Sequence, residues 1–200
     1  VYDFPVFYFP KFFHPDPSVK KRSGLLQPRL NSSSIVGTSI NQPYYHVISQ
    51  NKDFTFKPTI FDNRIYMFQN EYRQENKNSS FIADFAYTKG YKSKLSNNRN
   101  GMSHLFSKYD LDLGLKDFLN SKLNILVEKV SMDTYLKVFE NAILTDETFE
   151  SNLKDHNTME TSVKLSLDHD NYNLTSALHT FMKVENDIDM PDAVTTIDEV

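Results

Sequence analysis

Side chains that could carry out acid–base, nucleophilic or metal chemistry are scattered along this sequence. The six histidines are dispersed, and the Asp-His-Asp run from Asp168 to Asp170 is better explained as a turn, because no second ligand pair has a suitable spacing. No Ser-His-Asp order, glycine-rich phosphate loop or pair of catalytic carboxylates stands out. Cysteine is absent, which leaves neither disulfides nor thiolate metal ligands in this segment. The sequence therefore predicts no enzyme, no metal and no cofactor.

The most distinctive chemistry belongs to two prolines. Pro28 and Pro43 lie fifteen positions apart, each inside a strand-like run of the stretch SGLLQPRLNSSSIVGTSINQPYYHVI. Proline has no backbone N–H, so each one removes a donor from a sheet and is normally confined to an edge or a bulge. The pair predicts a line of weakened hydrogen bonding in a sheet. The alternative is that these are edge prolines of a soluble sheet, where they would block aggregation.

Strands must position these prolines, because two-residue alternation dominates the chain after residue 22. In the run 52–61, Phe54, Phe56, Pro58 and Ile60 share one face, and polar side chains occupy the other. The same alternation recurs in five further runs: 64–74, 80–88, 104–115, 161–168 and 172–182. Tight turns rich in Asp and Asn, at 61–64 and 168–172, join some of these runs, and longer polar loops join others.

Residues 116–145 are an exception to this alternation. Apolar residues recur there at helical spacing, so a long amphipathic helix is a rival to a strand: Leu119, Leu123, Leu126, Val127 and Val130. We prefer a strand through 121–130, because the neighbouring segments are strands and a lone helix would leave them unpaired.

Composition narrows the class of protein. The chain has 200 residues, enough for one domain, with 16 Phe, 11 Tyr and a mean hydropathy of −0.52. A net charge of −4 argues against a general nucleic-acid binder, and no apolar run is long enough for a transmembrane helix. The chain begins at Val1, inside an apolar run, and we interpret it as an internal piece of a longer protein.

Alternating strands build both membrane barrels and soluble sandwiches or lectin-like folds. Two features favour the barrel. Apolar positions recur on one face for roughly the 9–11 residues that a tilted transmembrane strand needs. Tyrosines also cluster near the ends of the expected strands, where a membrane interface would place them, although tryptophan is absent: Tyr44, Tyr45, Tyr66, Tyr72, Tyr87 and Tyr109.

Five short motifs then occur in a fixed order: PVFYFPKF (5–12), HPDPSVKKRSGLLQP (14–28), PYY (43–45), DFTFKP (53–58) and EYR (71–73). In this order and spacing they resemble motifs of the LptD family, the outer-membrane proteins that assemble lipopolysaccharide. The segment 128–139, EKVSMDTYLKVF, also resembles a family segment. The dense match covers about the first third of the chain, and beyond residue 139 only compatible alternation continues.

The resemblance implies an all-β fold, an antiparallel transmembrane β-barrel that follows the last strand of a periplasmic β-jellyroll. Residues 1–17 would end the jellyroll and form a linker, and residues 18–200 would form the N-terminal part of the barrel. That part would hold roughly nine strands, and because the family's barrel is much larger, it would not close by itself. The implied location is the outer membrane of a Gram-negative bacterium, with a periplasmic N-terminal part.

The resemblance also implies transport without covalent chemistry. In this family the first barrel strand pairs with the last, and prolines in the first two strands thin the hydrogen bonding near that closure. Pro28 and Pro43 lie where these lateral-gate prolines lie, so lipopolysaccharide could leave sideways into the outer leaflet. The implied partners are lipopolysaccharide, outer-membrane lipids, a plug lipoprotein of LptE type and a periplasmic bridge of LptA type, with no nucleic acid.

Two further groups of residues are candidates for contact with lipopolysaccharide. The cations Lys20, Lys21, Arg22 and Arg29 lie where an anionic glycolipid would leave the jellyroll and could hold its phosphates, although a solvated turn explains them equally well. The aromatic run before them could line a groove for acyl chains, with Phe7 and Phe9 as its main candidates, although about half of this run would more simply pack in a core.

Two rival functions remain open. A different outer-membrane barrel, such as a porin or a receptor, would need no weakened strand pair, so replacing Pro28 and Pro43 should leave its activity intact. A soluble β-sandwich that binds carbohydrate or protein would stay in the aqueous fraction without detergent. Several family members also carry disulfides between jellyroll and barrel, for which this segment supplies no cysteine.

Overall fold

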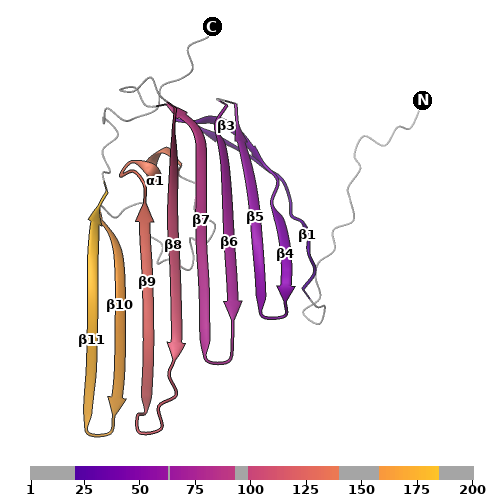
Figure 1. Ribbon diagram of the computed structural model, residues 1–200. Coiled ribbons are helices and arrows are strands. Elements are labelled where there is room, and N and C mark those ends of the chain that lie inside the picture. Colours follow the sequence, from indigo (N-terminus) through magenta and orange to yellow (C-terminus); the bar gives the residue numbers. More distant parts are fainter. Residues whose placement is uncertain (1–20, 63, 93–98, 140–157, 185–200) are drawn as a thin grey trace, which may run out of the picture.

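The computed structural model describes residues 21–62, 64–92, 99–139 and 158–184, and in them it forms one antiparallel sheet with one short helix (Figure 1). The strands are β1 (Gly24–Leu25), β2 (Arg29–Ser33), β3 (Gly37–Asn41), β4 (Tyr44–Ser49), β5 (Lys52–Phe61), β6 (Tyr66–Glu75), β7 (Ser79–Lys92), β8 (Arg99–Asp112), β9 (Asn120–Val130), β10 (Thr158–His169) and β11 (Tyr172–Lys183), and the helix is α1 (Tyr135–Val138).

The strands follow one another as a meander, in the order β1-β4-β5-β6-β7-β8-β9-β10-β11. The β2–β3 hairpin joins this sheet because β3 pairs with the carboxyl end of β5. The pairs Asn41–Thr59 and Tyr44–Phe56 share one register, so β3 and β4 are two halves of a single interrupted strand. Strands β1 and β2 are likewise two halves of the strand that precedes it.

The all-β prediction is confirmed, since every long element of the described chain is an antiparallel strand. Strands β1 and β11 are the two edges of the sheet and do not pair with each other, so the described residues form an open sheet. Closure into a barrel and the division of the chain at residues 17 and 18 stay predictions.

Two uncertain local assignments are also resolved. The segment 120–130 is strand β9 and pairs with both β8 and β10, so the strand was the correct choice over the helix. In the Asp168–Asp170 run, Asp168 and His169 end β10 and Asp170 begins a tight turn, across which His169 pairs with Tyr172 of β11. No helix in the described part of the chain is long and apolar enough to cross a membrane.

The two faces of the sheet differ sharply in chemistry. On β6, β7 and β8 the buried face carries polar side chains as well as apolar ones, among them Gln69, Asp84 and His104. Large apolar side chains instead point outward to the exposed face. The exposed apolar side chains on six strands are Ile40, Ile60, Tyr66, Phe68, Phe85, Tyr87, Leu105 and Val163. This is the reverse of a soluble protein, which buries its apolar face.

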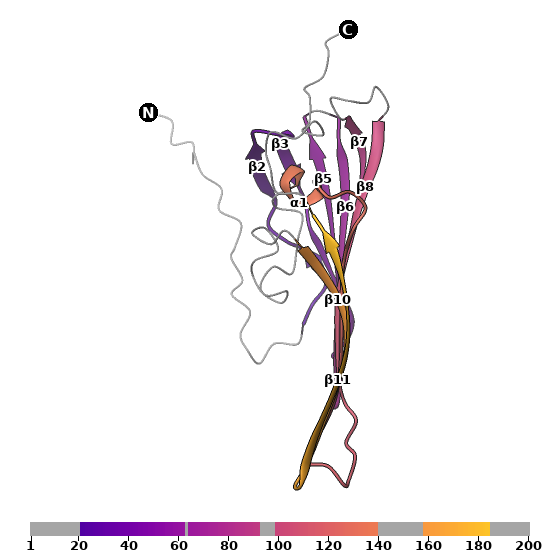
Figure 2. The ribbon, with the colours of Figure 1, turned by 90° about the vertical axis from the view of Figure 1, so that its left-hand side faces the viewer.

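The helix α1 lies on the polar-lined side of the sheet, between the β2–β3 hairpin and β8 (Figure 2). Phe139, just after this helix, packs its ring edge-on against Phe61 of β5 at 5.9 Å between ring centroids. Val36, Met67, Met102 and other buried side chains complete a small apolar core under α1. The core therefore lies at the end of the sheet where the β2–β3 hairpin turns.

Candidate functional site

The first two long strands are both interrupted at proline. Residues 26–28 separate β1 from β2 and end in Pro28, while residues 42–43 separate β3 from β4 and end in Pro43. Leu25 faces Tyr44 on one side of the interruption, and Arg29 faces Asn41 on the other. Three residues therefore lie opposite two, which is the geometry of a β-bulge. Both predicted prolines lie at this defect, one in each strand.

Pro43 leaves one side of a hydrogen-bonded pair without a backbone donor. Leu26 N–H donates to the Pro43 carbonyl oxygen at 2.9 Å, but Pro43 has no N–H to return to Leu26. The side-chain amide of Gln42 fills that place, since its Nε2 donates to the Leu26 carbonyl oxygen at 2.7 Å. The two strands are thus held here by one backbone bond and one side-chain bond.

A third proline weakens the neighbouring strand pair at the same level. Gln42 N–H donates to the Pro58 carbonyl oxygen of β5 at a long 3.4 Å, and Pro58 cannot donate back. Pro58 follows Pro43 by the same fifteen positions that separate Pro43 from Pro28. Alternation alone places Pro58 on an apolar strand face and does not reveal this missing donor, which the equal spacing of the three prolines could have indicated.

The predicted cations differ in their surroundings. Lys21 Nζ donates to Asp53 Oδ2 of β5 at 2.7 Å, and this hydrogen bond raises the pKa of Lys21, so the lysine stays charged and engaged. Arg22 and Arg29 are exposed near the same edge of the sheet. Lys20, Phe7 and Phe9 lie outside the described residues. Contact of any of these residues with a lipid stays a prediction.

A buried polar chain ties α1 to the sheet. Tyr135 Oη lies 2.9 Å from Nδ1 of His104, whose Nε2 lies 3.2 Å from Asp84 Oδ1. With Nε2–H donating to the carboxyl oxygen, Nδ1 accepts from the tyrosine hydroxyl. Burial raises the pKa of Tyr135, so the hydroxyl keeps its proton and can donate. All three side chains are buried, with at most 1% of their surface exposed, and we interpret the triad as a structural anchor.

Side chains that could bind a metal ion are not clustered in the part of the chain that the structure covers. No group of three or more histidine, aspartate or glutamate side chains is placed there to hold a metal ion. The site combines three structural features. The sheet edge lacks backbone N–H donors, two exposed arginines lie beside it, and the outer face of the sheet is apolar.

Comparison with known proteins shows which family this chain resembles. No protein-family model matches the chain. It is 34% identical over 136 residues to the LPS-assembly protein LptD of Polaromonas sp. (strain JS666), which covers 68% of this chain and 16% of that protein. It is 32% identical over 139 residues to LptD of Mannheimia succiniciproducens and 28% identical over 139 residues to LptD of Idiomarina loihiensis, with 68% and 70% of this chain covered.

The fold defines an all-β protein built on one antiparallel sheet with an apolar outer face. The chain belongs to the LptD family of LPS-assembly proteins, as the motifs had predicted. Its matched part spans 16–17% of the length of these relatives, so the chain represents a segment of such a protein.

Proposed function

We propose that this segment forms the first strands of an outer-membrane β-barrel that delivers lipopolysaccharide into the outer leaflet. Residues 18–200 would belong to the barrel, and residues 1–17 would end a periplasmic jellyroll. Lipopolysaccharide would leave sideways where the first two long strands are interrupted. The similar proteins are LPS-assembly proteins, which supports this proposal. We infer no covalent chemistry.

The observation that carries the proposal is the loss of donors along one line of the sheet. Pro43 and Pro58 each lack the N–H that would complete a hydrogen-bonded pair, and Pro28 lies in the bulge beside them. Each missing bond forfeits about 0.5–1.5 kcal/mol in water, and an unpaired group costs more in lipid. Strand separation is therefore cheapest along this line, which we call the proline seam: Pro28, Pro43 and Pro58.

The exposed apolar face supports a membrane location. Ile40 and Ile60 are directly paired and 51–52% exposed, and the outer face continues with aromatic side chains across β6 and β7. Outer-membrane strands alternate in this way, with apolar residues toward lipid and polar residues toward the lumen. In water the same face would be a large aggregation surface.

Arg22 and Arg29 are the better candidates for contact with lipid phosphates, because Lys21 is already paired with Asp53. A plug lipoprotein of LptE type would occupy the lumen, and a bridge of LptA type would join the jellyroll. The rival class of barrel, a porin or receptor, would not need a weakened strand pair, so the seam does not favour it. A soluble carbohydrate-binding sandwich would expose the apolar outer face to water, so this face does not favour that class either.

The proposal is tested by restoring the missing donors. In the full-length protein, replacing all three seam prolines with alanine should slow the appearance of new lipopolysaccharide at the cell surface several-fold. Ser176→Ala with Thr180→Ala on exposed β11 is the matched control and should leave the rate unchanged. Unchanged delivery in the triple variant, at normal protein levels, would favour a barrel of another kind.

A further inference from the structure

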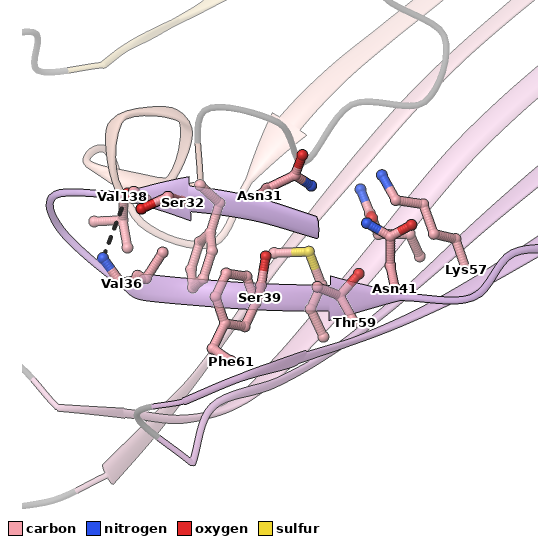
Figure 3. Close-up of a pocket in the computed structure, with 13 residues that line it drawn as sticks. Asn31, Ser32, Val36, Ser39, Asn41, Lys57, Thr59, Phe61 and Val138 are labelled. Carbon is pink, nitrogen blue, oxygen red and sulfur yellow. Dashed lines mark hydrogen bonds between the residues drawn. The ribbon is translucent and has the colours of Figure 1, made fainter. Parts of the chain in front are cut away.

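A pocket lies on the polar-lined side of the sheet, between the β2–β3 hairpin, β5, β6 and α1 (Figure 3). Hydroxyl and amide side chains line one part of it, and apolar side chains line the other. The polar part includes Asn31, Ser32, Ser39, Asn41, Lys57 and Thr59, and the apolar part includes Val36, Phe61, Met67 and Val138. These side chains come from β2, β3 and the turn between them, from β5 and β6, and from α1.

Two buried polar side chains in this pocket have no hydrogen-bond partner. Asn41 is 1% exposed, and neither its Oδ1 nor its Nδ2 is bonded. Thr59 is 5% exposed, and its Oγ1 is unbonded. The two residues are direct partners across β3 and β5, so the orphaned groups lie side by side. Buried polar groups are almost always paired, so such a cluster requires an explanation.

Packing alone does not account for these residue types. The next pair in the same register is Ile40 and Ile60, which the sheet accommodates on its opposite face. Leucine and valine at positions 41 and 59 would avoid the cost of burying unpaired groups. An amide and a hydroxyl are useful there if a ligand brings its own donors and acceptors.

We propose that this pocket binds the hydroxyl-bearing edge of a saccharide as it passes the seam. A sugar edge offers adjacent hydroxyl groups, which both donate and accept, and it has an apolar face that suits the Phe61 side of the pocket. The pocket has a volume of only about 40 Å³, so it would take the edge of a sugar and not a whole ring. Lys57 at the pocket also favours a sugar that carries an acidic group.

The position of the pocket fits its proposed ligand. Asn41 directly precedes the Gln42-Pro43 interruption, so a bound sugar would lie beside the seam on the face opposite the apolar side chains. This inference rests on the proposed function, because the sugar would be the saccharide part of lipopolysaccharide. The pocket would hold that part on the wet side while the acyl chains cross into lipid.

The test uses the full-length protein, purified in detergent with its partner lipoprotein. The probe is core oligosaccharide released from lipopolysaccharide, with lipid A alone as a second probe. Asn41→Leu and Thr59→Val should each weaken oligosaccharide binding about tenfold and leave lipid A binding unchanged. Ile40→Leu and Ile60→Val, on the opposite face of the same strands, are matched controls and should bind like the wild type.

A melting temperature of Asn41→Leu equal to or above that of the wild type would support the inference, because it separates loss of the ligand from loss of the fold. Absence of oligosaccharide binding to the wild type, or wild-type binding by both pocket variants, would overturn it. An equal loss of lipid A binding would also overturn it. Depleting the protein in cells tests the proposed function separately, since surface lipopolysaccharide should fall whether or not the pocket binds sugar.

Discussion

The side-chain amide of Gln42 donates to the carbonyl oxygen of Leu26 at 2.7 Å, in the place where the backbone N–H of residue 43 would donate if that residue were not proline. Leu26 N–H donates in return to the Pro43 carbonyl oxygen at 2.9 Å. A side chain can leave such a bond more easily than a backbone group fixed in a ladder. We therefore interpret Gln42 as the side chain that holds the proposed seam closed, and we call it the clasp.

Gln42→Leu should loosen the closed seam. The change leaves the exposed Leu26 carbonyl oxygen without its side-chain donor, at a cost of about 0.5–1.5 kcal/mol to local pairing. We expect faster hydrogen exchange of the Leu26 N–H and higher entry of large antibiotics that the outer membrane normally excludes. Gln50→Leu, at an exposed turn position, is the control. Unchanged exchange at Leu26 would mean that the clasp contributes nothing.

Pro43→Ala should rescue that variant. Alanine restores the backbone N–H facing Leu26, so in the Gln42→Leu background it replaces the lost bond and should return antibiotic exclusion to normal. In the wild-type background the same change should have a smaller effect, because the Leu26 oxygen is already bonded. A double-mutant cycle measures this dependence. Strictly additive effects of the two substitutions would contradict it.

Tyr135→Phe should release α1 from the sheet. The substitution removes the hydroxyl that lies 2.9 Å from His104 Nδ1 and leaves a buried ring nitrogen unpaired, at a cost of about 1–3 kcal/mol. Limited proteolysis should then cut the segment 131–139 several-fold faster than in the wild type. Tyr66→Phe, on the exposed face, is the control. Equal cleavage of both variants would show that the anchor does not hold this segment.

Phe68→Arg should impair membrane insertion if the exposed face contacts lipid. Arginine on the lipid side of a barrel strand costs about 2–4 kcal/mol near the midplane. The full-length variant should accumulate less in the outer membrane and lose the heat-modifiable mobility of a folded barrel. Asn78→Arg, in the exposed turn between β6 and β7, should insert normally. Normal insertion of the Phe68 variant would contradict a lipid-facing position.

The sequence predicts the strands well where one face is buried. In β5, Thr59 and Phe61 are buried and Ile60 between them is exposed, as two-residue alternation requires. Apolar residues at helical spacing around Leu126 were ambiguous, because a short apolar run suits either element, and pairing of β9 with two neighbours decides it. Alternation alone does not say which face meets lipid.

The details of the site depend on contacts that no local pattern encodes. Pro28 and Pro43 could be identified from the sequence because proline removes a backbone donor from any β-sheet in which it lies. The clasp at Gln42 could not, since it depends on which carbonyl oxygen of the adjacent strand comes within reach of one amide. The contact of Phe139 with Phe61 likewise depends on a segment that returns across several strands.

The most direct test of the central claim is a reversible lock across the interrupted strands. Leu25 and Tyr44 are paired beside the seam, and the segment has no cysteine, so Leu25→Cys with Tyr44→Cys can form a defined disulfide. Val163→Cys with Leu178→Cys locks the β10–β11 hairpin as a control. We predict that oxidation of the first pair alone stops surface delivery of lipopolysaccharide and that reduction restores it. Continued delivery with the first pair fully crosslinked would contradict the account.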